Sequence, residues 1–147
     1  MDSHYVNTVV VNMHVIPIPA QAGITGFESP AAEYGQLAMS LDDLLVEHPS
    51  STFLGIAQGE SMQDVGIFDG DMIIVDRYET ARHGDVIVAN FNGEFICKIL
   101  DIHLRLLLSS NQKFLPVTIH EYDDFSIEGI ATRSIRCHRQ SPLLVVK

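Results

Sequence analysis

From residue 52 onward the chain alternates short β-prone runs with glycine-containing turns, and this alternation restricts its fold more than any other feature. Turn signals such as Asn92-Gly93 separate runs of apolar and β-branched residues, a pattern typical of antiparallel strands joined by tight connections. We expect strands over residues 52–57, 71–76, 85–90, 94–101, 104–109 and 126–130, with a further candidate over 133–146. The chain is therefore predicted to be mainly β, with twisted antiparallel sheets.

One helical pattern precedes these strands, between Ser40 and Glu47. Ser40 is a suitable N-cap, with Asp43 three residues later, and His48-Pro49 ends the helix. Three leucines form an apolar stripe that we expect to pack into the core: Leu41, Leu44 and Leu45.

The chain length of 147 residues suits a single domain with one hydrophobic core. No apolar run approaches the ~18–20 residues that a transmembrane helix needs, and no basic segment followed by an apolar one marks a secretory signal. We therefore expect a cytoplasmic protein that does not act at a membrane.

The net charge of −10 argues against direct binding to DNA, because such binding depends on clustered lysine and arginine. The densest basic stretch holds Arg133, Arg136 and Arg139. We interpret it as a solvated strand or tail in preference to a phosphate-binding patch. We expect that the protein reaches nucleic acid through a protein partner, without specific DNA contacts of its own.

Metal and cofactor motifs are missing from the sequence. Cys97 and Cys137 form no CxxC pair and are interpreted as small hydrophobic residues. His83 and His103 could be ligands, but we expect them to be surface or turn residues. Neither a P-loop nor a GxGxxG motif is present, so no cofactor and no metal are predicted.

Ser61 and Lys98 are the candidate catalytic pair. A serine hydroxyl becomes a good nucleophile when a base takes its proton, and a lysine can be that base when its surroundings keep it neutral. Lys98 lies in the apolar run Phe95-Ile96-Cys97-Lys98-Ile99-Leu100, and burial can lower a lysine pKa by roughly 3–5 units. In a strand, Ile96 and Leu100 share the face of Lys98.

Three segments carry a resemblance to the LexA/UmuD family of self-cleaving Ser–Lys peptidases. Residues 59–76, which begin Gly59-Glu60-Ser61-Met62, closely resemble the nucleophile segment of the family, although relatives often carry a smaller polar residue in place of Glu60. Residues 83–98 are similar to the block that leads to the lysine. Upstream, Ala22-Gly23 looks like the bond that this family cuts, and residues 27–34 are very similar to the segment after the cut in UmuD proteins.

The resemblance implies a single compact peptidase domain over residues 41–147, a flexible segment over 23–40, and an N-terminal arm over 1–22 that is removed by self-cleavage. It implies that Ser61 attacks the Ala22 carbonyl, that Lys98 is the base, and that Gly23 becomes the new N-terminus. Backbone N–H groups at Ser61 and Met62 are expected to form the oxyanion hole.

The resemblance also implies partners and a cellular role. A RecA–single-stranded DNA filament would promote cleavage in the SOS response, and the trimmed chain would form a homodimer that assists an UmuC-like Y-family polymerase in translesion synthesis. Three alternatives stay open: a LexA-like repressor, a signal-peptidase-like enzyme and a non-catalytic interaction module. The short arm of 22 residues argues against the first, because it cannot hold a helix-turn-helix module. The missing membrane anchor argues against the second.

Overall fold

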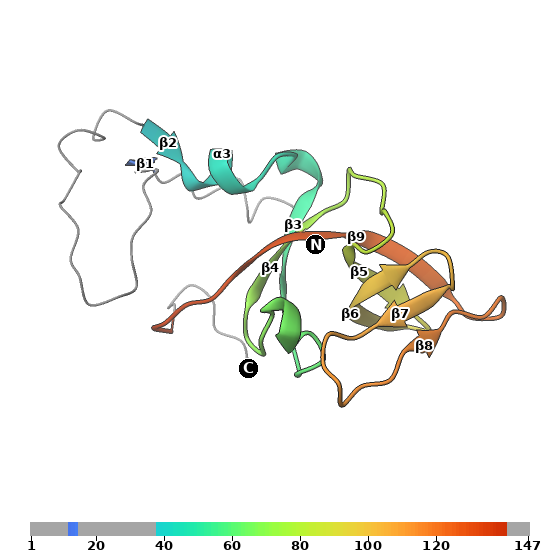
Figure 1. Ribbon diagram of the computed structural model, residues 1–147. Coiled ribbons are helices and arrows are strands. Elements are labelled where there is room, and N and C mark those ends of the chain that lie inside the picture. The colour runs from blue at the N-terminus through green and yellow to red at the C-terminus, as the bar shows by residue number, and fades with distance from the viewer. Residues whose placement is uncertain (1–11, 15–37, 141–147) are drawn as a thin grey trace.

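The computed structural model describes residues 12–14 and 38–140. These residues form a mainly β structure with two antiparallel sheets (Figure 1). A two-stranded sheet pairs β1 (Asn12–His14) with β2 (Ala38–Ser40). A seven-stranded sheet has the strand order β3-β4-β9-β5-β6-β7-β8. The fold class predicted from the sequence is therefore confirmed.

The seven strands of the large sheet are all antiparallel to their neighbours. Their bounds are β3 (Thr52–Ile56), β4 (Met72–Asp76), β5 (Val86–Phe91), β6 (Glu94–Asp101), β7 (Leu106–Leu108), β8 (Val117–Thr118) and β9 (Phe125–Ile135). The predicted strands agree with β3 to β7. Strand β9 joins the predicted strand 126–130 to the start of the candidate 133–146, of which residues 136–140 are not in a strand. The two-residue strand β8 was not predicted, because its apolar run is too short to stand out.

Strand β9 holds the sheet together, since it pairs with β4 on one side and with β5 on the other (Figure 1). Its register shifts once against β4, between Ile74 and Val75, and once against β5, between Val88 and Ala89. Such bulges bend a strand and increase its right-handed twist. Two bulges in this interior strand therefore curl the sheet, and this curvature accompanies a cleft bordered by the non-adjacent strands β3 and β6.

The β5–β6 hairpin confirms the turn predicted at Asn92-Gly93. Both residues have positive φ angles, 51° and 89°, as a type I′ turn requires. The turn fixes a register in which Ile87 lies opposite Lys98 and Val88 lies opposite Cys97. The position of Lys98 is thus set by a tight connection only a few residues away.

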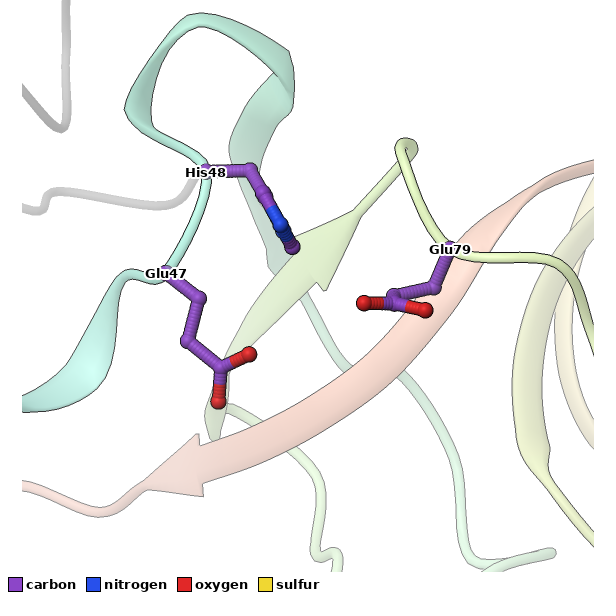
Figure 2. A group of neighbouring side chains, drawn as sticks. All are labelled: Glu47, His48 and Glu79. Carbon is purple, nitrogen blue, oxygen red and sulfur yellow. The ribbon is translucent and has the colours of Figure 1, made fainter.

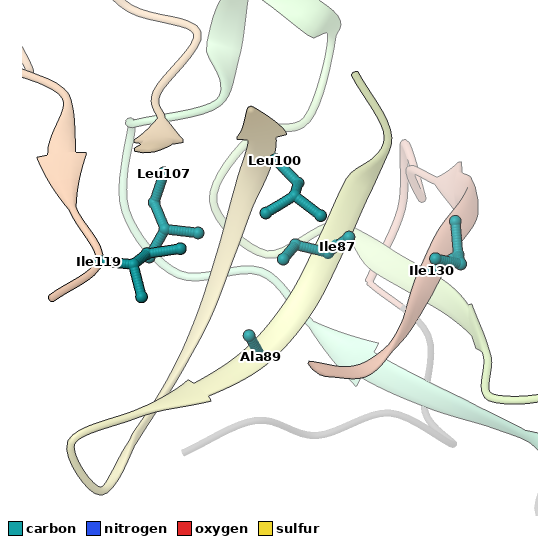
Figure 3. Packing of buried hydrophobic residues seen from close by; sticks show 6 residues of the cluster. All are labelled: Ile87, Ala89, Leu100, Leu107, Ile119 and Ile130. Carbon is teal, nitrogen blue, oxygen red and sulfur yellow. The ribbon is translucent and has the colours of Figure 1, made fainter. Parts of the chain in front are cut away.

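Alternate residues of β6 pack on opposite faces, as the sequence pattern predicted. Ile96 and Leu100 belong with the first core cluster, whereas Cys97 and Ile99 pack against the second. The buried members of the first cluster are Ile87, Ala89, Leu100, Leu107, Ile119 and Ile130, shown in Figure 3. The second cluster is built on Ala57, Met62, Ile67, Ile73 and Val75 and lies beneath the cleft.

The predicted helix is present as α3 (Leu41–Leu45), with the Asp43 N–H donating to Ser40 Oγ at 3.0 Å. The expectation that its leucine stripe is core was wrong in part. Leu41 and Leu44 remain 41% and 43% exposed, and only Leu45 packs against buried residues, in the small cluster of Val46 and Ile74. A helix of little more than one turn offers too narrow a face to bury all three. Within the described residues, no helix has the length and hydropathy to cross a membrane.

The β1–β2 pair joins two parts of the chain that flank residues 15–37. Asn12 lies opposite Ser40 and His14 lies opposite Ala38. Strand β1 belongs to the predicted N-terminal arm 1–22, and β2 ends the segment 23–40. Residues 15–37 lie outside the described part of the structure.

The close approach of β9 to β4 at Gly129 gives a test of the central packing. A Cβ atom at Gly129 would lie 2.6 Å from Val75 Cγ1 and 2.8 Å from the Asp76 carbonyl oxygen. Since the backbone oxygen cannot move aside, we predict that Gly129→Ala lowers the free energy of unfolding by about 1–3 kcal/mol. Urea denaturation of the full chain measures this.

The matched control is Gly55→Ala, whose Cβ would meet Val75 Cγ2 at 3.9 Å, an ordinary contact. We expect that variant to change stability by less than about 1 kcal/mol. Equal stability of the two variants would contradict the packing described here.

Candidate functional site

A cleft of about 480 Å³ opens between β3 and β6. Residues 53–59 form one side and residues 95–98 the other, while Ile73, Val75 and Val88 contribute to its lining from β4 and β5. Both Ser61 and Lys98 line this cleft, so the structure brings the two predicted catalytic residues to one cavity. Their side chains are not hydrogen-bonded to each other in the described structure.

Ser61 lies in a turn that leads into a short 3₁₀ helix, Gln63–Val65. Its neighbour Met62 is buried in the second core cluster and holds the turn against the sheet. The loop is closed at its base by backbone hydrogen bonds from Ala57 N–H to the Asp71 carbonyl and from Gly70 N–H to the Ala57 carbonyl, both 2.8 Å. The candidate nucleophile is therefore carried by an anchored loop.

A second anchor comes from the end of β9. The Arg136 guanidinium donates to both carboxylate oxygens of Asp71, at 2.8 and 2.9 Å, and to the Gly66 carbonyl at 3.0 Å. The hydrogen bond from Arg136 holds the pKa of the buried Asp71 carboxyl below its usual range. Arg133 also has an acidic partner, Glu47. The basic stretch was expected to be a solvated strand or tail; Arg133 does lie in a strand, but both arginines are ion-paired and not merely solvated.

The third set of contacts to the loop comes from the segment Ser109-Ser110-Asn111, directly after β7. Ser110 N–H donates to the Ser61 carbonyl at 2.7 Å, and Asp64 N–H donates to the Ser110 carbonyl at 2.7 Å. The Asn111 side chain donates to the Glu60 carbonyl at 2.8 Å. The three residues, which we call the 109–111 clamp, thus fix the backbone on both sides of Ser61.

Lys98 is half-buried in β6, and its pKa is lowered from the ordinary lysine value because burial disfavours the ammonium. Negative charge at neighbouring Cys97 opposes this effect, but burial raises the pKa of that thiol to about 11, which keeps it neutral at physiological pH. Lys98 Nζ donates to Ser109 Oγ at 2.8 Å and lies 5.6 Å from the centre of the Phe114 ring. Burial therefore shifts the pKa of Lys98 in the direction that the apolar run predicted.

Sequence reasoning missed Ser109 and the clamp altogether. The signal that could have found Ser109 is the β6–β7 register, in which Ile99 lies opposite Leu108. One step further along the two strands, Lys98 lies opposite Ser109. Without the length of the turn after β6, that pairing could not be read from the sequence.

The remaining predicted site groups are the oxyanion donors and the two residues of the predicted cleavage site. Within the described residues, the N–H groups of Ser61 and Met62 have no hydrogen-bond acceptor, and they remain the predicted oxyanion donors. Ala22 and Gly23 lie outside the described residues.

The histidines and cysteines singled out in the sequence are structural or exposed. The rings of His83 and His103 are in tilted contact, with ring centres 4.5 Å apart and an interplanar angle of 45°, at exposed turn positions. Cys97 packs against the second core cluster as expected of a small hydrophobic residue. Cys137 is exposed, so the same expectation was wrong for it, since it follows β9 at the surface.

A group of ligand-type side chains lies away from the cleft, near the start of β3. Figure 2 shows Glu47, His48 and Glu79 converging, with one possible ligand atom of each within 4.8 Å of the others. His48 Nδ1 lies 2.6 Å from Asp76 Oδ2, and its ring stacks on Tyr78 at 4.3 Å. The hydrogen bond to Asp76 raises the pKa of His48. These contacts account for the imidazole as part of the packing.

Comparisons with known proteins agree with this geometry. Residues 16–132 match the model of the family described as Peptidase S24-like. The chain is 38% identical to Protein MucA of Salmonella typhimurium, over 86% of this chain and 88% of the relative. It is 37% identical to Protein ImpA of Shigella flexneri, over 71% and 68% respectively. It is 34% identical to the LexA repressor of Xylella fastidiosa, over 85% of this chain and 60% of that repressor.

The family match covers most of the chain and includes both residues of the candidate pair, Ser61 and Lys98. The similarity to MucA extends over nearly the whole of both chains, whereas the LexA repressor has a large part that this chain does not match. The chain therefore belongs to the Peptidase S24-like family of self-cleaving serine peptidases, as a UmuD-like member of the LexA/UmuD group.

Proposed function

We propose that the protein is an autoprotease that cuts its own Ala22-Gly23 bond with Ser61 as nucleophile and Lys98 as general base. The observation that carries this proposal is the convergence of both side chains on one cleft, where burial lowers the lysine pKa. A neutral lysine is the chemical requirement of a Ser–Lys pair. The family match supports peptidase chemistry.

In the proposed reaction, neutral Lys98 takes the proton of the Ser61 hydroxyl while Oγ attacks the Ala22 carbonyl carbon. The bond from that carbon to the Gly23 nitrogen breaks, and Lys98 returns the proton to the leaving amine. Water, activated by Lys98, then hydrolyses the Ser61 ester and releases the Ala22 carboxylate. The N–H groups of Ser61 and Met62 would stabilise the oxyanion in both steps.

The free side of β3 offers a way to hold the substrate. β3 is an edge strand, paired only with β4 among the described residues, and it forms one wall of the cleft. An extended segment can add to such an edge through main-chain hydrogen bonds. We propose that residues around Ala22-Gly23 bind there, in cis or from a second copy, because small residues permit close backbone approach to Ser61.

The wider role follows the family. We propose that the arm 1–22 is removed in the SOS response when a RecA–single-stranded DNA filament favours the cleavage-competent conformer. The trimmed chain, with segment 23–40 and domain 41–147, would act as a cytoplasmic homodimer that assists an UmuC-like Y-family polymerase in translesion synthesis. The similarity to MucA and ImpA over most of their length supports this proposal over a repressor.

Replacement of either catalytic residue should abolish self-cleavage. Ser61→Ala and Lys98→Ala should each reduce the rate by roughly a thousandfold or more, and the double variant should be no worse, because the two groups act as one unit. Gel electrophoresis of purified full-length protein over time measures this. The matched control is Lys113→Ala, at an exposed lysine, which should cleave normally. Substantial cleavage by Lys98→Ala at pH 7 would assign the base to another group.

The cut should fall between Ala22 and Gly23, since this small–Gly pair precedes the UmuD-like segment 27–34. N-terminal sequencing of the large fragment should give Gly23, and intact mass spectrometry should match residues 23–147. A large fragment with a different first residue would refute the assignment of the bond.

The rate of self-cleavage should rise with pH, because only the deprotonated form of Lys98 can accept the serine proton. Burial lowers the Lys98 pKa, so the midpoint of the rise should lie below the ordinary lysine value of 10.5. Initial rates between pH 7 and 11 would define it. A rise proportional to hydroxide throughout, with the same profile in Lys98→Ala, would remove lysine from the mechanism.

A further inference from the structure

Ser109 is the polar partner that the structure gives to Lys98. In the β6–β7 register Leu100 lies opposite Leu107 and Ile99 lies opposite Leu108, so the next cross-strand position places Ser109 opposite Lys98. Directly opposed residues of antiparallel strands project from the same face with their side chains in contact distance. The 2.8 Å hydrogen bond from Lys98 Nζ to Ser109 Oγ is therefore a consequence of the strand pairing.

The remaining neighbours of Lys98 cannot orient its amine. On the other side of β6 its cross-strand partner is Ile87, which is fully buried and apolar. The centre of the Phe114 ring lies 5.6 Å from Nζ, and the attraction of a ring face for a cation is lost when the amine is neutral. No carboxylate of the described residues forms an ion pair with Lys98. A lysine has a flexible four-carbon stem, so without Ser109 its Nζ would sample many positions.

We propose that Ser109 is a positioning residue for the reaction, which holds the Lys98 amine so that its lone pair faces Ser61. A neutral amine has two N–H donors and one lone pair. When one N–H is donated to Ser109 Oγ, rotation about the last bond of the side chain is restricted and the lone pair remains available for the serine proton. This inference rests on the proposed function, and it adds a third residue to the Ser–Lys pair.

The clamp that contains Ser109 also sets the position of the nucleophile. Ser110 N–H holds the Ser61 carbonyl at 2.7 Å, while the adjacent Ser109 holds Lys98 at 2.8 Å. Base and nucleophile are thus located by neighbouring residues of one backbone segment. Misplacement of reacting groups by about 1 Å can reduce the rate about a hundredfold. Attachment of both groups to one backbone segment therefore favours the proposed reaction.

The same hydrogen bond affects the charge state of Lys98. A hydroxyl oxygen that accepts from an ammonium stabilises the charged form, so loss of Ser109 Oγ should lower the Lys98 pKa further. Cys97 is the titratable neighbour whose charge acts on Lys98. The other charged residues of the adjoining segments are Glu60 and Asp64, in the loop that carries Ser61, and Lys113, which follows the clamp. None of these groups changes in a Ser109 variant.

The test compares Ser109→Ala and Ser109→Thr with Ser110→Ala in the full chain. Ser110 is the matched control, because its contacts to the loop are made by its backbone. We expect Ser109→Ala to reduce the high-pH plateau of self-cleavage by about tenfold or more and to move the midpoint of the rate profile to lower pH. Ser109→Thr keeps a hydroxyl and should retain the plateau rate and the midpoint of the parent protein. Ser110→Ala should also leave both quantities unchanged. Thermal melting of each variant separates these effects from loss of fold.

A direct measurement keeps the inference separate from the proposed function. The Lys98 pKa can be followed by NMR in a Ser61→Ala background, where no cleavage occurs, and Ser109→Ala should lower it relative to Ser110→Ala. An unchanged Lys98 pKa together with an unchanged rate profile would overturn the role of Ser109. The role of Ser109 would also be overturned if a natively folded Ser109→Thr variant kept neither the rate profile nor the Lys98 pKa of the parent protein. If the parent protein does not cleave itself, the proposed function fails, and an unchanged pKa in Ser109→Ala would still refute the contact.

Discussion

The hydrogen bonds between the 109–111 clamp and the turn around Ser61 are the interactions on which the site depends. Ser61 and Lys98 come from separate parts of the sheet, and strand pairing alone does not bring a loop after β3 to a side chain in β6. The clamp follows directly from β7, whose register with β6 is fixed by three paired residues on each strand. It therefore fixes the loop that carries Ser61 relative to the β6–β7 hairpin. The Asp71–Arg136 pair secures the other end of that loop against β9.

Curvature of the sheet is the second requirement, and β9 supplies it. A flat seven-stranded sheet would keep β3 far from β6, with three strands between them. Both bulges lie in β9, close to Gly129, where the absence of a side chain lets β4 approach. The cleft is thus a product of irregular features in one interior strand, and Lys98 becomes half-buried because the curled sheet places apolar walls around it.

Sequence patterns predicted the parts of this structure that depend on interactions between residues close together in the chain. The Asn92-Gly93 turn, the alternation in β6 and the Ser40 cap all follow from neighbouring residues and were confirmed. The exposed Leu41 and Leu44 were not predicted, because burial depends on what lies opposite a helix face. Ser109 and Arg136 were missed as site residues for a related reason, since their partners lie 11 and 65 positions away along the chain. The candidate pair Ser61 and Lys98 was predicted from the apolar run around Lys98 and from resemblance, and the burial of Lys98 lowers its pKa in the predicted direction.

The pairing of β1 with β2 has a consequence for what a single cut would do. While residues 15–37 connect the two strands, their association is intramolecular and benefits from a high effective concentration. A cut between Ala22 and Gly23 would turn the same three-residue contact into an association of separate molecules, and a two-stranded ribbon of that size is barely stable even when connected. The arm would dissociate and leave the edge of β2 unpaired, a template for another chain. Hydrolysis of one bond would then create a binding surface without any change in the folded domain.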